Sequence, residues 1–570
     1  MNSRGTVQPI PRADFAVKPF THGAWRGEIV SPSSDLLEAL LSMLESPSDA
    51  RVLKEGRARK VWVGAALGRG LLIKEYRTPR WEDRLAALLR GSRAALEWRS
   101  AKRLAEQGVP IPQPILWGEH RGAEGEPRGV VVFEFIADGQ PIREFMNADS
   151  RLSPEMRRAM FVSLGSALGR LHRAGAEHGD AHPGNLLVTR RSGKPEVLIL
   201  DLHQVRRRRT LPWRKRLTNL GQFLAGQGEY LSTGSKQRCL QAYLEALGDW
   251  SPPFPSEREA RRSMGRAVEF FAHRAFRGHW RSRLAKCVRE GKRFHRLRLG
   301  EYSGWVRAEW DSPALSEALA DPNALFSGPC STLLKDTPTT SVARVALPGL
   351  LRPLFAKRYN RKGPWERIKN LFRRSRAMKV WRSAYALEIL GIPTPTTVAV
   401  LERRKGPLLL ESFILTEWIE GGVGYDDFYR ESRRAPRGQA GAHDLRVLEL
   451  AVANLFRALH SHGISHGDLK GRNVLLDPNA PAPHAPRLVD LDAMTLRPMR
   501  FRRARINDLS RLLFSVYEAT TPAAWVRFFR EYSRRDAALW RDRRRWWSAI
   551  RRRTARKLIE KHGKIPERER

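Results

Sequence analysis

The feature that most constrains this chain is an internal repeat of its own sequence. Six segments of the first half recur in the same order in the second half, displaced by about 280–290 positions. The matched pairs are 92–112 with 375–395, 52–63 with 333–345, 71–77 with 354–360, 131–139 with 414–422, 217–224 with 506–513, and the motifs that begin at His178 and His466. Chance produces one such match easily but not six in register, so the sequence predicts two homologous domains.

The repeat also sets the domain organisation and the fold class. We expect one domain over residues 20–275, a connector over 276–300 and a second domain over 301–570. In each copy, apolar segments ending in "IKEY" or "AKRY" read as strands, and a helix with a 3.6-residue apolar period follows and stops at "GVPIP" or "GIPTP". The pattern predicts an α+β fold in which each tandem domain has a small β-rich lobe followed by a larger helical lobe.

Each copy contains the same ordered set of oxygen-bearing side chains. The set is Asp180, Asn185 and Asp201 in the first copy, and Asp468, Asn473 and Asp490 in the second. One carboxylate can accept a proton from an acceptor hydroxyl. An amide oxygen and a second carboxylate can hold Mg²⁺, which neutralises phosphate oxygens during transfer. The order predicts a kinase-type phosphotransferase.

A strand lysine lies upstream of each set and is placed to reach the phosphates of ATP: Lys74 in the first copy and Lys357 in the second. Glu97 on the following helix would hold Lys74, but the gapless alignment puts Val380 opposite Glu97. A valine cannot orient a lysine by charge, so we expect the first copy to carry most of the turnover. The alternative is that another acid, such as Glu366 or Glu388, replaces Glu97 in the second copy.

These motifs resemble a known family. "HGDAHPGN…LILDLH" and "HGDLKGRN…LVDLD" are similar to the protein-kinase-like superfamily. The wider pattern "LLIKEYR…SRAALEWRSAKRLAEQGVPIPQPI…VVFEFI…LGRLHRAGAEHGD" resembles the bacterial lipopolysaccharide core kinases, which phosphorylate Kdo or heptose. The resemblance covers most of both halves, and it implies ATP and Mg²⁺ as cofactors and an anionic sugar or lipid as acceptor.

The resemblance also implies a role for each matched residue. The bases would be Asp180 and Asp468, and the Mg²⁺ ligands would be Asn185, Asp201, Asn473 and Asp490. The nucleotide-binding residues would be Lys74, Glu97, Glu134, Lys357 and Glu417, with Glu134 and Glu417 in the adenine-binding hinge. Asn219 and Asp508, on matched helices, would support the catalytic loop.

The sequence departs from the family pattern in two places. Neither copy has a GxGxxG phosphate loop, because "EGRARKVWVG" and "DTPTTSVARV" stand there instead. The Asp-Phe-Gly triplet is replaced by Asp201-Leu-His203 and by Asp490-Leu-Asp492. Asp492 is therefore either an additional metal carboxylate or a solvated turn residue.

The formal net charge of +43 over 570 residues indicates an anionic partner. Arginines follow each metal aspartate, at Arg206, Arg207, Arg208, Arg209, Arg497, Arg500, Arg502, Arg503 and Arg505, where they suit an anionic acceptor or pair with local carboxylates. Arginine-rich helices are expected around 77–93, 358–376 and 538–561. In the last of these, Leu539, Trp546 and Ile550 form a stripe that would face either an anionic membrane or the protein itself.

The expected location is the cytosolic face of the membrane, as a peripheral protein. Three scattered cysteines, no secretory signal and no apolar run long enough to span a bilayer lead to this expectation. Two other functions stay open: an atypical Ser/Thr protein kinase, since Lys470 in "HGDLKGRN" fits that pattern, and a pseudokinase scaffold or nucleic-acid-binding protein. Neither an aromatic RNA-binding consensus nor a zinc-finger spacing is present, which argues against a nucleic-acid partner.

Overall fold

A computed structural model of the chain divides into two compact units, Met1–Arg277 and Gly278–Arg570. The residues that the structure describes are 16–30, 34–47, 50–56, 59–77, 91–120, 128–146, 153–191, 193–225, 233–248, 257–360, 374–434, 442–480, 485–496, 500–534 and 536–563. Most of the expected arginine-rich helices at 77–93 and 358–376, together with Glu366 and Arg497, lie outside the described residues.

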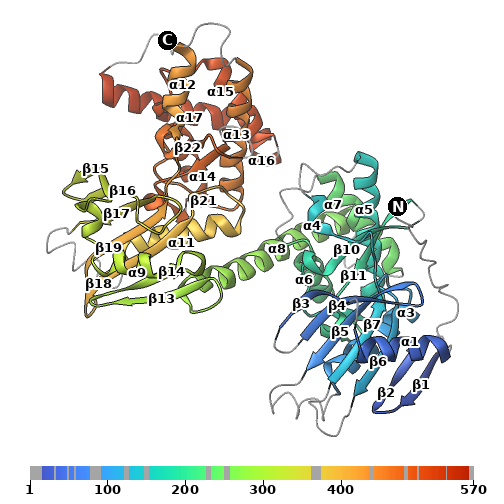
Figure 1. Cartoon of the computed structure of the whole chain (residues 1–570). Helices are drawn as coiled ribbons and strands as arrows, with labels where there is room; N and C mark the ends of the chain where they lie inside the picture. Colours follow the sequence, from blue (N-terminus) through green and yellow to red (C-terminus); the bar gives the residue numbers. More distant parts are fainter. Residues whose placement is uncertain are drawn as a thin grey trace. The chain divides into compact units, whose positions relative to one another are not determined.

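The first unit is built on a seven-stranded antiparallel sheet (Figure 1). In spatial order its strands are β1 (Val17–His22), β2 (Trp25–Val30), β6 (Pro114–His120), β7 (Arg128–Glu134), β5 (Arg69–Arg77), β4 (Arg59–Ala66) and β3 (Arg51–Glu55). Two small sheets follow, made of β11 (Lys194–Ile199), β10 (Leu186–Arg191) and β8 (Gln140–Pro141), and of β12 (Val205–Arg207) and β9 (Ala176–His178). Its helices are α1 (Ser34–Glu45), α3 (Arg93–Glu106), α4 (Ile142–Met146), α5 (Pro154–Arg173), α6 (Trp213–Phe223), α7 (Thr233–Leu247) and α8 (Glu257–Leu284).

The second unit repeats this architecture strand by strand. Its seven-stranded sheet has the order β13 (Phe294–Leu299), β14 (Tyr302–Arg307), β18 (Thr397–Lys405), β19 (Leu408–Glu417), β17 (Leu354–Tyr359), β16 (Thr340–Val345) and β15 (Ser331–Thr337). The small sheets are β20 (Val423–Gly424), β22 (Val474–Asp477) and β23 (Ala485–Leu488), and β21 (Ile464–Ser465) with β24 (Thr495–Leu496). The helices are α9 (Pro313–Ala320), α11 (Arg376–Ile389), α12 (Tyr425–Arg434), α13 (Ala442–Ser461), α14 (Phe501–Ser515), α15 (Pro522–Ser533), α16 (Ala537–Arg541) and α17 (Arg543–His562).

The expected α+β fold with a tandem pair of kinase-like domains is confirmed by these matching units. The expected connector at 276–300 contains the last part of α8 and the strand β13, and β13 pairs with β14 in the second sheet. The division between the units falls inside α8, whose Val268 packs in the core of the first unit and whose Trp280 packs in the core of the second.

Matched local signals produce the helix that lies next to each sheet. The Ser92 hydroxyl caps α3 by accepting a hydrogen bond from the amide of Ala95, and Ser375 caps α11 in the same way. After each helix the chain turns at a glycine with positive φ, Gly108 at 68° and Gly391 at 67°. The signals therefore fix the same helix start and stop in both copies.

Each large sheet is covered on both faces, and strand alternation decides which side chains face the site. In β5, Ile73 packs in the cluster that contains α1, whereas Tyr76 packs in the cluster that contains α3. Because successive side chains on a strand point to opposite faces, Lys74 lies on the same face as Tyr76. In β17, Ala356 packs in the cluster that contains α9, and Tyr359 packs in the cluster that contains α11. Lys357 alternates with Ala356 and therefore lies on the α11 side, with Tyr359.

Candidate active sites

The catalytic loop of the first unit runs from β9 to β10 and is held by its own motif residues. The Asn185 side-chain amide donates to the Asp180 carbonyl oxygen at 2.8 Å, and the His178 ring nitrogen Nε2 lies 2.8 Å from the carbonyl oxygen of Leu200. The Asp180 carboxylate itself points outward and is 52% exposed, with His182 Nε2 3.6 Å away. It is therefore free to meet an acceptor hydroxyl.

A buried residue on the following helix supports each catalytic loop. Asn219 on α6 accepts from the amide of His178 and donates to its carbonyl oxygen, at 3.1 and 2.8 Å. Asp508 on α14 accepts from the amides of His466 and Gly467, both at 2.9 Å. Both residues occupy the supporting position that the sequence indicates for them.

In the first unit the strand lysine is fixed by the helix acid. Lys74 Nζ lies 2.6 Å from Glu97 Oε1 and 3.5 Å from Asp201 Oδ1. Glu97 is fully buried on α3, where it also accepts from the Tyr76 hydroxyl and from the amide of Leu202. The structure thus brings together three of the predicted residues, Lys74, Glu97 and Asp201.

Asp201 is held in a strained backbone conformation beside several cations. Its φ is 60° and that of the matched Asp490 is 56°, in the left-handed region that non-glycine residues avoid at a cost of about 1–2 kcal/mol. Arg59 and His203 contact its Oδ1 atom at 2.8 and 3.0 Å. Burial by itself would raise the pKa of Asp201, but the hydrogen bond from His203 and the charges of Lys74 and Arg59 hold that pKa well below its usual range.

The residues present fit a divalent metal ion. Asp201 stays ionised at every physiological pH because its pKa is lowered. The side-chain nitrogen of Asn185 donates to the Asp180 carbonyl oxygen, so the side-chain oxygen of Asn185 points away from that carbonyl and can bind a metal ion. A carboxylate and an amide oxygen are the hard oxygen donors that Mg²⁺ and similar ions prefer. In the second unit Asn473 donates to the Asp468 carbonyl oxygen at 2.7 Å and offers the same arrangement with Asp490.

The second unit has an acid for its lysine, as the alternative expected, but this acid is neither Glu366 nor Glu388. That the first copy carries most of the turnover stays a prediction. Lys357 Nζ lies 2.8 Å from Asp490 Oδ1 and 3.1 Å from Asp492 Oδ2. The Tyr359 hydroxyl, which matches that of Tyr76, donates to Asp492 Oδ1. Asp492 therefore receives the lysine and tyrosine contacts that Glu97 receives in the first unit.

The helix next to the sheet contributes an acid in the first unit but cations in the second. In the second unit α11 carries the cations: Arg376 lies 2.6 Å from Asp492 Oδ2, and Lys379 donates to the Asp492 carbonyl oxygen at 2.8 Å. Burial would raise the pKa of Asp492, but the charge of Lys357 and the hydrogen bond of Tyr359 lower it. Asp492 is half-buried and engaged on both oxygens, so it is not a solvated turn residue, and in this structure its carboxylate faces Lys357.

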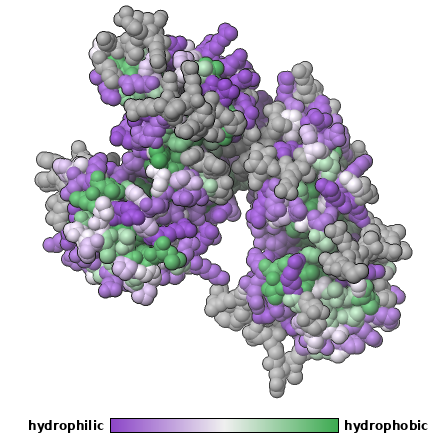
Figure 2. Space-filling model, turned by 45° about the horizontal axis from the view of Figure 1, so that its top comes forward, coloured by the Kyte–Doolittle hydropathy of each residue, from purple (hydrophilic) through white to green (hydrophobic). Residues whose placement is uncertain are grey.

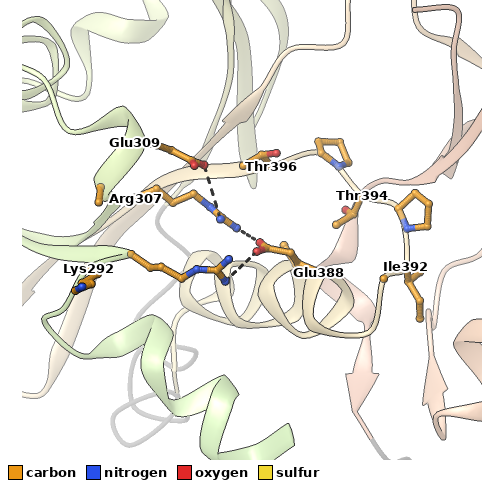
Figure 3. Close-up of a pocket in the computed structure, with 13 residues that line it drawn as sticks. Lys292, Arg307, Glu309, Glu388, Ile392, Thr394 and Thr396 are labelled. Atoms are coloured by element: carbon orange, nitrogen blue, oxygen red, sulfur yellow. Dashed lines mark hydrogen bonds and ion pairs between the residues drawn. The ribbon is translucent and has the colours of Figure 1, made fainter. Parts of the chain in front are cut away.

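Glu388, the other acid considered for Lys357, serves a different place. Its carboxylate is bound by Arg307 and by Arg293, the latter at 3.6 Å, on the wall of a cavity of about 470 Å³ (Figure 3). The cavity is lined by the end of α11, the segment after it and the residues around Arg307, and none of the predicted site residues lines it. Glu388 therefore joins α11 to Arg307 of β14 and does not contact Lys357.

Asp468, the predicted base of the second unit, has more cations next to its carboxylate than Asp180 has. Lys470 Nζ lies 2.9 Å from Asp468 Oδ2, and Arg511 on α14 lies 3.3 Å from Asp468 Oδ1. Burial would raise the pKa of Asp468, but these two cations lower it. The two bases thus stand in different electrostatic surroundings.

The two glutamates predicted for the adenine-binding hinge, Glu134 and Glu417, end the matched strands β7 and β19. The Glu134 amide donates to the Gln113 carbonyl oxygen at 2.9 Å, and the Glu417 amide donates to that of Thr396 at 2.8 Å. The Glu417 side chain is used within the protein, because it accepts from Arg487 on β23 at 3.2 Å. This ion pair ties the large sheet of the second unit to its helical lobe.

Comparison with known proteins identifies the family. The lipopolysaccharide kinase (Kdo/WaaP) family matches residues 37–243 and, again, residues 351–532. The chain belongs to the lipopolysaccharide kinase (Kdo/WaaP) family. Members of this family are kinases, so the chain is a kinase, and kinase chemistry uses ATP together with a divalent metal ion.

Individual members of the Kdo/WaaP family are distant in sequence. The lipopolysaccharide core heptose(I) kinase WaaP of Pseudomonas aeruginosa is 25% identical over 34% of this chain and 76% of that protein. The Escherichia coli enzyme of the same name is 29% identical over 24% of this chain and 52% of its own length. A solved structure of WaaP in complex with acyl carrier protein is 22% identical, with a TM-score of 0.30, over 39% of this chain and 89% of that chain.

The sequence does not predict three contacts in these sites: Arg59 with Asp201, Asp492 with Lys357, and Arg511 with Asp468. The missing glycine-rich loop could have indicated Arg59. Without backbone amides to bind phosphate there, a cation at the start of β4 can make those contacts instead. For Asp492 the signal was the doubled acid in "DLD", read together with Val380. No local pattern distinguishes Arg511 from the many other arginines of the Kdo/WaaP kinase.

Proposed function

We propose that both units transfer the γ-phosphoryl group of ATP to a hydroxyl of an anionic sugar or lipid acceptor, with inner-core lipopolysaccharide (Kdo or heptose) as that acceptor. The observation that carries the proposal is the recurrence of one geometry: in each unit a strand lysine, a catalytic aspartate, an asparagine and a left-handed aspartate lie on equivalent elements. An acid also binds the lysine in each unit, from the helix in the first and from the turn after the left-handed aspartate in the second. A scaffold that had lost catalysis would need none of this set twice.

Each residue has a defined task in this proposal. Mg²⁺ bound with ATP neutralises phosphate charge and holds the phosphates in place. In the first unit Asn185 and Asp201 hold that ion, Lys74 contacts the phosphates, and Asp180 accepts the proton of the attacking hydroxyl. Lys74 keeps its place because Glu97 binds it at 2.6 Å. Since phosphoryl transfer depends mostly on positioning and charge stabilisation, this rigidity is the main contribution of the chain.

The nature of the acceptor rests on charge and on the relatives. The arginines Arg206 to Arg209, which follow Asp201, are exposed at the edge of the first site, although Arg208 also pairs with Glu177 at 3.3 Å. The Pseudomonas and Escherichia relatives are core heptose kinases by name. An acceptor that carries phosphate or carboxylate groups would be bound by such guanidinium groups.

The proposed location is the cytosolic face of the membrane, where anionic lipids would attract the basic protein. The apolar stripe of α17 is not available for lipid, because Trp546 and Ile550 are buried against the rest of the second unit. The outer face of α17 remains strongly basic. No helix among the described residues is long and apolar enough to cross a bilayer. On the face shown in Figure 2, hydrophobic residues form separate patches within a mostly hydrophilic surface.

The test is a transfer experiment with competing acceptors. Purified protein is incubated with radiolabelled ATP and Mg²⁺ and with three separate fractions: lipopolysaccharide, lipid A without core sugars, and protein. We expect label in the lipopolysaccharide fraction. Label confined to protein Ser or Thr would replace this proposal with the protein-kinase alternative, and nucleotide binding with no transfer to any fraction would replace it with the scaffold alternative.

A further inference from the structure

The catalytic aspartate of the second unit has both of its oxygens occupied by cations. Lys470 takes Oδ2 at 2.9 Å and Arg511 takes Oδ1 at 3.3 Å. A carboxylate bound in this way is a poor proton acceptor, because each cation favours the ionised form. For Asp468 to act as a base, one of the two cations has to leave it.

A second helix adds a further cation at the same place. Thr554 on α17 donates to the carbonyl oxygen of Ser510 at 3.3 Å, and Ser510 precedes Arg511 on α14. Lys557 lies one helical turn after Thr554, so it faces the same part of α14. Its pKa is lowered by burial and then by the charges of Arg511 and Arg553, while Asp468 acts in the opposite direction.

The cluster therefore holds more positive than negative charge. The cations are Lys470, Arg511, Arg553 and Lys557, and the acids that act on Lys557 are Asp468 and the exposed Glu560. The buried Nε atom of Arg553 has no hydrogen-bond partner among the residues that the structure describes. Partly buried like charges repel one another, and an additional anion would remove that cost.

We propose that Arg511 and Lys557 form a subsite for a phosphate or carboxylate group on the acceptor of the second unit. When this group binds Arg511, it draws the guanidinium away from Asp468 Oδ1, which then faces the acceptor hydroxyl. The inference rests on the proposed phosphotransfer function and adds that the second unit acts on an acceptor that is already anionic close to the reacting hydroxyl.

The first unit lacks this arrangement. Gln222 stands at the position of Arg511 in the matched helices, and it accepts from Asn219 at 3.2 Å instead of reaching the catalytic aspartate. Asp180 is 52% exposed, against 32% for Asp468. The subsite is therefore a difference between the two units and distinguishes the acceptors, or the acceptor positions, that they use.

The experiment measures equilibrium binding of radiolabelled inorganic phosphate to the full chain by dialysis. Saturating Mg²⁺ and a non-hydrolysable ATP analogue fill the nucleotide sites, and 150 mM chloride, roughly the physiological ionic strength, screens exposed charge. The test variant is Arg511→Gln/Lys557→Met. The control variant, Arg298→Gln/Lys405→Met, removes the same charge from exposed positions of the second sheet.

We expect the test variant to bind phosphate at least about tenfold more weakly than the parent, because two charged hydrogen bonds are lost. The control variant should stay within about twofold of the parent. The swap Arg511→Lys/Lys557→Arg keeps the charges and should retain binding, which separates loss of the subsite from misfolding. Equal phosphate binding by the parent, the test and the control variants would overturn the subsite. So would the absence of phosphate binding by the parent while the ATP analogue fills the nucleotide sites.

This result is separable from the test of the function. If lipopolysaccharide takes no label but phosphate binding still depends on Arg511 and Lys557, the acceptor assignment fails and the anion subsite stands. If lipopolysaccharide takes label but phosphate binding is indifferent to the two side chains, the subsite fails and the function stands.

Discussion

Lys357 and Asp492 form an ion pair of 3.1 Å in the second unit, where the first unit has the 2.6 Å pair of Lys74 and Glu97. The acid that holds the strand lysine has moved from the helix to the turn after the metal aspartate. Val380, at the helix position, is buried among apolar neighbours. The two units therefore hold the strand lysine with acids that come from different elements.

The first prediction concerns Asp492 as a positioning residue. In a chain whose first unit is silenced by Asp180→Asn, Asp492→Ala should slow transfer by about 10²-fold, because the lysine loses its orientation. Single-turnover transfer from ATP is the measurement. Glu388→Ala, which changes an acid on α11 that contacts no predicted site residue, should leave the rate unchanged.

A rescue experiment distinguishes orientation from general stability. The double exchange Val380→Glu/Asp492→His rebuilds in the second unit the arrangement of Glu97 and His203, and it should recover at least about a tenth of the parent rate. Parental rates in Asp492→Ala alone would contradict the role of this residue.

The second prediction concerns membrane binding by the outer face of α17. Arg543, Arg544 and Arg545 are exposed on this helix. Each basic residue near an anionic surface contributes about 1 kcal/mol, so replacing all three with Gln should weaken binding to phosphatidylglycerol vesicles by about 10²-fold at low salt. Flotation in a density gradient measures the bound fraction.

The control variant loses the same number of positive charges at positions outside α17. Replacing three exposed arginines near the second sheet with Gln should have a much smaller effect; these are Arg289, Arg296 and Arg298. Equal binding to neutral vesicles, or binding that survives 1 M salt, would show that charge on α17 does not drive the association.

The third prediction concerns the pH dependence of stability in the first unit. Burial lowers the pKa of His172 to about 4, against an ordinary value of 6.5, and the ring contacts Tyr243 at 2.9 Å and Asn219 at 3.2 Å. Between these two values the unfolded chain binds the proton and the folded chain does not. Stability therefore falls as the pH is lowered from 6.5 towards 4, by about 2 kcal/mol at pH 5 from this group.

Urea unfolding at pH 7 and pH 5 measures this effect. His172→Gln cannot titrate, so the variant should lose about 2 kcal/mol less than the parent over the same pH interval, although it is less stable at pH 7. Identical pH dependence in the parent and the variant would mean that folding does not lower the pKa of His172.

Sequence reasoning recovers the parts of this molecule that depend on local order. The repeat, the strand that carries Lys74, the helix that carries Glu97 and the loop that carries Asp180 all follow from periodicity and spacing, because each is encoded within a short segment. Asp492 is different. Its contact with Lys357 joins positions that are 135 residues apart, and only the fold brings them together.

The same limit applies to the basic residues. Arg511 and Lys557 have the pattern of ordinary residues of amphipathic helices. The tertiary fold brings Arg511 of α14 to Asp468, and the packing of α17 on α14 adds Lys557. The tryptophan stripe of α17 is helical, as the sequence indicates, but only packing decides that Trp546 faces the protein core and not a membrane.

The most direct test of two working active sites is the pair of base substitutions. Single-turnover transfer from radiolabelled ATP is compared in Asp180→Asn, Asp468→Asn and the double variant. Each single variant should keep the turnover of the other unit. The double variant should lose at least about 10²-fold in rate, with ATP–Mg²⁺ affinity largely preserved, because a general base contributes to the rate and not to nucleotide binding. Full turnover in the double variant would contradict the account.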